Sequence, residues 1–168
     1  MFHFGTNSQH KLSTIHHILA RVAHGALAIS SIDFGVISGL RTGIDQLELY
    51  KRKDSQLNGI QKGKKRGNMI GTGVSMHQFR LAFDVLAYIG PTESWEVSLY
   101  VEIADAIRVS ATSLGVKIIW GGCWDKPLTD MKSAEDIRKN MKRYQRKKAA
   151  QGKTAFVDAG HFQLERRL

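Results

Sequence analysis

The sequence has 168 residues, of which 42% are hydrophobic and two are proline, and its formal net charge is +10. This composition is typical of one globular domain with its own apolar core, and it excludes a chain that is disordered over long stretches. No run of about 18 apolar residues occurs, which excludes a transmembrane helix, and the single cysteine excludes an internal disulfide.

Apolar residues at helical spacing predict a first helix over 7–29. Its buried stripe consists of Leu12, Ile15, Leu19, Val22, Ala26 and Ile29. A short strand over 33–40 and a second helix over 45–53 follow, and a loop rich in glycine and lysine continues to residue 73. The apolar run over 81–89 then predicts a largely buried strand.

The second half of the chain continues the alternation of helices and strands. A helix over 94–114 is predicted to end with Gly115 as its C′ residue, because glycine adopts the left-handed conformation that this position favours. Short strands are predicted over 116–120 and 160–164. Together these elements predict an α+β fold of one domain, in which helices flank a small sheet. The turn expected after His77 favours antiparallel pairing.

Two imidazoles and two carboxylates stand out as candidates for a metal site. Asp158 and His161 lie near the end of the chain, whereas His77 and Asp84 lie near its middle. A catalytic zinc site typically has three protein ligands and an open position for water, and a further carboxylate then acts as general base. The fold, and not one local loop, must assemble such a site.

The spacing of His77 and Asp84 constrains the backbone between them. Seven residues span about 10 Å on a helix and about 23 Å on a strand. Two ligands of one zinc ion cannot lie that far apart, so we expect the chain to reverse over 78–81. An ionised Asp84 in an apolar strand is costly unless it is paired or bound to metal, which favours this carboxylate over those on the surface.

The segment Ser75–Asp84 (S-M-H-Q-F-R-L-A-F-D) resembles the S-x-H-x-x-G-x-A-x-D signature of zinc peptidases that cut peptidoglycan stem peptides. That family includes D-alanyl-D-alanine carboxypeptidases and phage L-alanyl-D-glutamate endolysins. The resemblance implies that zinc, one ion per chain, is bound at the sheet by His77, Asp84 and His161. It also implies that Asp158 is the catalytic acid and base.

Other parts of the sequence also resemble this family. Gly39–Thr42 (G-L-R-T) is similar to a family element whose arginine contacts the substrate or the developing oxyanion, which implies this role for Arg41. The stretch Trp120–Trp124 (W-G-G-C-W) resembles one that lies near the cleft in the family. Core packing is an equal alternative for both tryptophans.

The sequence departs from the family pattern at two positions. Arg80 stands where the family has glycine, so the turn either avoids a positive φ or differs in local geometry. Asp158 stands where the carboxypeptidases have glutamate, which favours the endolysin branch. Two further candidates are set aside. One is Cys123, which is interpreted as a small buried hydrophobe. The other is a possible second metal site formed by three histidines, which are predicted to face solvent: His10, His17 and His24.

The positive charge is concentrated in two segments, 51–66 and 132–153. The second is predicted to be a basic helical insertion in the single domain 1–168, with Ser133 as N-cap and Ile137, Met141 and Tyr144 on its apolar side. Such a face attracts anionic envelope polymers and other polyanions. A solvated helix without a partner is the alternative, and no zinc-finger or RNP-like motif supports specific binding of nucleic acid.

The sequence therefore predicts a zinc peptidase of bacterial cell-wall peptide, with peptidoglycan as substrate and a phage L-alanyl-D-glutamate endolysin as the favoured member. A D-alanyl-D-alanine carboxypeptidase is the alternative within the family, and a basic non-enzymatic nucleic-acid-binding protein is the alternative outside it. The start of the chain shows no secretory signal. We expect a monomer that is made in the host cytoplasm and acts on the wall after release.

Overall fold

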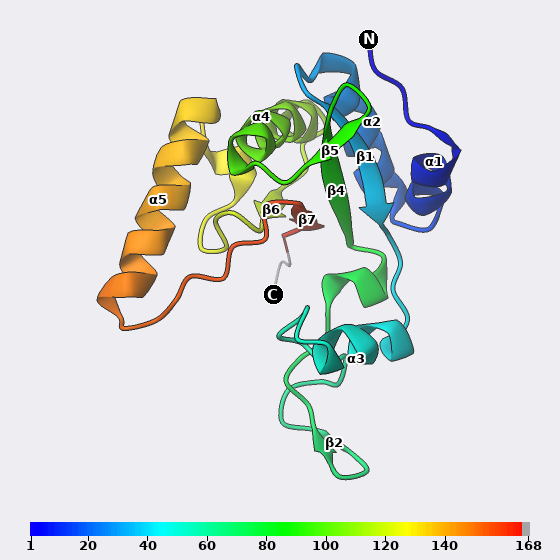
Figure 1. Cartoon of the computed structure of the whole chain (residues 1–168), viewed down its shortest axis with the longest axis vertical. Coiled ribbons are helices and arrows are strands. Elements are labelled where there is room, and N and C mark those ends of the chain that lie inside the picture. The colour runs from blue at the N-terminus through cyan, green and yellow to red at the C-terminus, as the bar shows by residue number, and fades with distance from the viewer. Residues whose placement is uncertain (166–168) are drawn as a thin grey trace.

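The computed structural model describes residues 1–165, and Figure 1 shows the arrangement of their elements. In chain order the elements are α1 (Thr6–Ser13), α2 (His17–Ile29), β1 (Asp33–Ser38), α3 (Gly43–Lys51), β2 (Lys65–Arg66), β3 (Met69–Ile70), the 3-10 turn Met76–Phe79, β4 (Ala82–Ile89), β5 (Thr92–Ser94), α4 (Val97–Ser113), β6 (Ile118–Trp120), the 3-10 turn Leu128–Asp130, α5 (Ala134–Ala150) and β7 (His161–Leu164). Within these residues, no helix is both long and apolar enough to cross a membrane.

The main sheet has the strand order β1-β4-β7-β6, and β5 pairs with the far end of β4. Every pairing in it is antiparallel, which confirms the predicted α+β fold and sheet type. Strand β4 lies between β1 and β7, and five of its eight side chains are fully buried. This central position explains why the apolar run of β4 is nearly continuous and is interrupted only by Asp84.

Helices α2 and α4 pack against each other and contribute much of the apolar core. A close approach between them is marked by the hydroxyl of Ser110, which donates to the carbonyl of Val22 at 2.9 Å. Helix α4 ends as predicted, with Gly115 at φ +67° immediately after the last turn. The core therefore lies on the helix-covered side of the sheet, and the functional site is built on strands that this core holds in place.

The prediction of one helix over 7–29 is wrong, because α1 and α2 are separate helices. The hydroxyl of Thr14 accepts the backbone N–H of Leu40, and the N–H of His16 donates to the carbonyl of Arg80 at 2.8 Å. The second of these bonds takes the N–H of His16 out of helical pairing, and the first anchors the end of α1 to Leu40. Ile29, predicted to be buried, is 56% exposed. The three histidines that the sequence set aside are exposed as predicted: His10, His17 and His24.

The segment 132–153 forms α5, whose N-cap is Ser133 as predicted: its hydroxyl accepts the N–H of Asp136 at 3.3 Å. The predicted apolar side is buried, and it consists of Ile137, Met141 and Tyr144. The glycine- and lysine-rich segment contains a small ribbon of β2 and β3 that the sequence did not predict. In Figure 1 this ribbon projects below α3, away from the five-stranded sheet.

Candidate active site

The sheet register brings two of the candidate ligands together. Asp84 on β4 and His161 on β7 are direct partners across the antiparallel ladder, so their side chains lie on the same face. His77 lies on the 3-10 turn Met76–Phe79, immediately before β4. The chain reverses between His77 and Asp84, as the spacing predicts.

This reversal uses a left-handed residue. Arg80 has φ +62° and ψ +20° and ends the 3-10 turn. Of the two possibilities left open for this departure from the family pattern, the structure excludes the one in which the turn avoids a positive φ. The turn is also capped at its start. The side chain of Ser75 accepts the N–H of His77 at 3.4 Å, and the side chain of Gln78 accepts the N–H of Ser75 at 3.0 Å.

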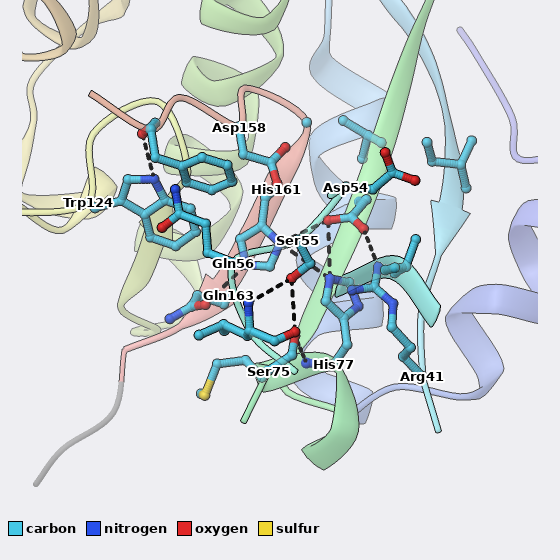
Figure 2. Close-up of a pocket in the computed structure, with 18 of the residues that line it drawn as sticks. Arg41, Asp54, Ser55, Gln56, Ser75, His77, Trp124, Asp158, His161 and Gln163 are labelled. Atoms are coloured by element: carbon cyan, nitrogen blue, oxygen red, sulfur yellow. Dashed lines mark hydrogen bonds and ion pairs between the residues drawn. The ribbon is translucent and has the colours of Figure 1, made fainter. Parts of the chain in front are cut away.

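Three ligand atoms converge at the base of a cleft (Figure 2). His77 Nε2 lies 3.1 Å from Asp84 Oδ1, His161 Nδ1 lies 2.8 Å from the same oxygen, and the two nitrogens are 3.2 Å apart. Ligands at about 2.0 Å from a tetrahedral zinc ion are separated by about 3.3 Å, so the donor set and its spacing fit such an ion. Both imidazoles are buried, with 1% of His77 and 7% of His161 exposed.

The outer contacts of the imidazoles set their tautomers. His77 Nδ1–H donates to the carbonyl of Gly39 at 2.7 Å, which leaves the lone pair of Nε2 facing the other ligands. His161 Nε2–H donates to Gln163 Oε1 at 3.0 Å, which leaves the lone pair of Nδ1 free in the same way. Histidine ligands of metals are typically oriented by such partners.

The pKa values of Asp84 and His161 are shifted by their neighbours in the site. Burial alone raises the pKa of Asp84, but the two imidazoles outweigh it and hold the pKa of this carboxyl far below its usual range. Burial lowers the pKa of His161, and the hydrogen bond and charge of Asp84 outweigh it, so the net shift is upward. The site therefore favours an ionised Asp84 next to positive charge, which either protonated imidazoles or a cation between the three ligand atoms can supply.

Arg41 lies in the cleft wall and binds the far side of this carboxylate. Its Nη2 donates to Asp84 Oδ2 and to Ser38 Oγ, each at 3.1 Å, and its Nη1 donates to Gln46 Oε1 at 3.0 Å. The remaining N–H groups of the guanidinium are left for other partners. Gln46 is fully buried and also binds Ser55 and the carbonyl of Leu57. This network orients Asp84 so that Oδ1 faces the imidazoles.

Asp158 precedes β7, is half-buried and lines the same cleft. Burial raises the pKa of this carboxyl, and the negative charge of Asp84 raises it further. A carboxyl with a raised pKa is suited to exchange protons near neutral pH. The chain thus brings together all five residues that the sequence singled out: Arg41, His77, Asp84, Asp158 and His161.

The Trp120–Trp124 stretch has a structural explanation. Gly121 donates its N–H to the carbonyl of His161 and accepts the N–H of Asp158, and a Cβ at this glycine would clash with the carbonyl oxygen of Asp158. Only glycine permits this approach. Trp120 is fully buried in the core, whereas Trp124 lines the cleft with its ring centroid 5.2 Å from that of His161. Cys123 is buried, as predicted.

The cleft has a volume of about 640 Å³. Its lining includes the segments that precede and follow the β2–β3 ribbon, and it also includes three aromatic residues: Trp124, Tyr144 and Phe156. Sequence reasoning did not single out Gln46 and Gln163 among the residues around the site. Gln163 had one available signal, because residues two apart on a strand point to the same face and His161 is its neighbour in this sense.

Two imidazoles and a carboxylate under an open cleft, with a further carboxyl beside them, form a group that could hold a metal ion, an arrangement that metal-dependent hydrolases use. The comparisons with known proteins identify the family. The family model for phage L-alanyl-D-glutamate peptidase matches residues 1–164, and the chain belongs to this family.

Two relatives are similar over most of the chain. The L-alanyl-D-glutamate peptidase of Escherichia phage T5 is 27% identical over 125 residues, which are 74% of this chain and 82% of that protein. The crystal structure of the L-Ala D-Glu endopeptidase ChiX of Serratia marcescens superposes with a TM-score of 0.65 at 27% identity, covering 97% of this chain and 90% of the other.

Proposed function

We propose that the chain is a zinc peptidase that hydrolyses the L-alanyl-D-glutamate bond of peptidoglycan stem peptides, as a phage endolysin. The convergence of His77 Nε2, Asp84 Oδ1 and His161 Nδ1 beneath a cleft is the observation that carries this proposal. Family membership favours this activity over the two alternatives left open by the sequence, a D-alanyl-D-alanine carboxypeptidase and a nucleic-acid-binding protein.

We propose that His77, Asp84 and His161 hold one zinc ion. Two imidazole nitrogens and one carboxylate oxygen are ligands that zinc commonly takes in catalytic sites with an open position. When bound, zinc polarises the scissile carbonyl and lowers the pKa of a water toward neutrality. The tautomers set by Gly39 and Gln163 support this assignment, because both leave lone pairs facing the site.

The remaining chemistry falls to Asp158 and Arg41. The carboxylate of Asp158 accepts the proton of the attacking water and then delivers it to the leaving amine, a role supported by its raised pKa and its place in the cleft. The free N–H groups of Arg41 bind the developing oxyanion or a substrate carboxylate. The bond from Arg41 to Asp84 adds a positioning role that the sequence did not predict.

We further propose that the segment 132–153 is a basic insertion in the single domain and that it attracts anionic envelope polymers. Some of the basic residues of α5 are engaged by carboxylates and are less available to an anionic polymer. Ion pairs engage four basic residues of α5: Arg138, Lys139, Arg143 and Lys147. The ammonium of Lys148 lies over the ring of Tyr144 at 5.6 Å. Within residues 1–165, Lys142, Arg146 and Lys148 therefore supply the charge of this helix that no carboxylate pairs.

The proposed setting is that of a monomer released from the host cytoplasm onto the wall. For its proposed role in host lysis, the enzyme must reach peptidoglycan. We propose that a separate step releases it from the cytoplasm. The family assignment supports peptidoglycan as the partner.

Metal analysis tests the proposed function. The purified protein should contain about one zinc per chain. Chelation should abolish wall lysis, and addition of zinc should then restore it. His77→Ala and His161→Ala should each abolish zinc retention and lysis. His10→Ala is the matched control, because this exposed histidine lies on α1. Full zinc content and full lysis in either ligand variant would refute the assignment.

A further inference from the structure

The β2–β3 ribbon carries the largest cluster of unpaired positive charge outside the cleft. We call residues 61–70 the cationic ribbon; its four cations are all exposed: Lys62, Lys64, Lys65 and Arg66. No acidic residue occurs between Asp54 and Asp84, and within residues 1–165 none of the four cations takes part in an ion pair. This exposed positive potential is not neutralised by the rest of the fold.

The base of the cationic ribbon is rigidly held by polar contacts. Asn58 is 1% exposed; its Nδ2 donates to the carbonyl of Ile70 at 2.8 Å, and its Oδ1 accepts the N–H of Thr72 at 3.0 Å. Gly71 bonds across to Lys64, and a Cβ there would lie 2.1 Å from the carbonyl oxygen of Gln61. The direction in which the ribbon projects is therefore fixed by its base.

The same base is tied to the active site. Gln46 binds the carbonyl of Leu57 at 2.6 Å and also accepts from Arg41, which binds Asp84. The cleft is lined by residues 54–57, before the ribbon, and by residues 74–76, after it. The cationic ribbon is thus continuous with two segments that line the cleft, and it projects from them below α3 (Figure 1).

The side chains of the ribbon indicate which anion it suits. Residues 57–76 contain no Phe, Tyr or Trp, so the platform on which nucleic-acid bases stack is absent from this segment. Three of the four cations are lysines, which act as point charges toward any anionic group, whereas bidentate recognition of a carboxylate or a phosphate favours arginine. Lys65 lies opposite Ile70, which is 61% exposed, so that face offers one ammonium beside a single apolar side chain.

We propose that the cationic ribbon binds carboxylates of peptidoglycan stem peptides adjacent to the one held in the cleft. This inference rests on the proposed function, because the substrate is then a polymer that carries carboxylates at every peptide. Attraction of this kind raises the local concentration of the polymer at the cleft without contributing to the chemical step. It predicts an effect on the polymeric wall and none on a small soluble peptide.

Binding to purified walls tests the inference. Walls stripped of lipid and phosphate polymers are sedimented with the protein in an Asp158→Asn background, which prevents their digestion. Lys64→Gln with Lys65→Gln should weaken binding about tenfold at about 0.05 M salt, and the difference should vanish at about 0.5 M. The matched control is Lys11→Gln with Arg21→Gln, which removes the same charge from exposed positions of α1 and α2 and should change binding less than about twofold.

Chemical amidation of the wall carboxylates should abolish the advantage of the unmodified ribbon. Equal losses in the ribbon and control pairs, or no loss in either, would overturn the inference, as would a loss that persists on amidated walls. The Lys64→Gln, Lys65→Gln pair is also assayed with Asp158 intact, on a soluble stem peptide. If hydrolysis of this peptide falls as much as wall binding does, Lys64 and Lys65 act in the cleft and the inference is overturned. If the unmodified enzyme cuts neither the wall nor the soluble peptide, the proposed function is refuted. This outcome is distinguishable from failure of the inference, because the binding comparison does not depend on cleavage.

Discussion

Replacing Gln163 by Met removes the acceptor of the His161 ring and keeps a side chain of similar length. The imidazole is only 7% exposed, so water has little access to its Nε2–H once the 3.0 Å bond to Gln163 is lost. A buried donor without a partner costs about 1–3 kcal/mol. This cost falls on the tautomer whose Nδ1 lone pair faces Asp84 and His77.

The imidazole escapes this cost by moving its proton to Nδ1 or by rotating, and either change removes the lone pair from the proposed metal site. The free energy of binding zinc should therefore become less favourable by a similar amount. An energy of about 1.4–2.7 kcal/mol corresponds to a loss of roughly 10–100-fold in affinity, the range observed for outer partners of histidine ligands.

Competition between the protein and a chromophoric chelator measures the zinc affinity without relying on catalysis. Gln163→Glu is the control, because its carboxylate keeps an acceptor for His161 Nε2–H, and it should bind zinc at least as tightly as the unmodified protein. Unchanged zinc affinity in Gln163→Met would refute the reasoning. A loss of equal size in both variants would show that the acceptor is not the cause.

Three further predictions concern other parts of the molecule. Asp158→Asn should keep zinc and the fold while wall hydrolysis falls by roughly 10²–10⁴-fold, and loss of zinc would instead make Asp158 a ligand. Arg80→Gly should raise the free energy of unfolding by about 0.5–1 kcal/mol, since relief of about 1–2 kcal/mol of left-handed strain exceeds the entropic cost of glycine; a denaturant titration showing lower stability would contradict this. Lys142→Gln with Arg146→Gln should weaken wall binding at low salt without affecting hydrolysis of a soluble stem peptide, and equal loss on both substrates would place these two charges at the cleft.

The main elements near the site could be predicted because they follow from local constraints. A strand that is apolar except for Asp84 must be buried, and ligands seven residues apart require a reversal, so β4 and the turn before it follow from the sequence. The family motif then adds His161 and Asp158 from the far end of the chain. The structure brings these side chains together through the register of β4 and β7.

The features that sequence reasoning missed depend on contacts between distant segments. The break between α1 and α2 is set by hydrogen bonds to Leu40 and Arg80, which no helical pattern encodes. Gln46 lies on a helix with mostly exposed neighbours, and it is buried only because the loop at Leu57 packs over it. Polar networks of this kind have no periodic signature, so their members could not be distinguished from surface glutamines.

The termini produced from peptidoglycan test the central claim most directly. Purified wall is digested with the zinc-loaded protein, and the soluble and insoluble products are analysed by mass spectrometry. We expect new amino-terminal D-glutamate on the released peptides and L-alanine left on the glycan. Release of terminal D-alanine alone, or a wall that remains uncut by protein with a full complement of zinc, would contradict it.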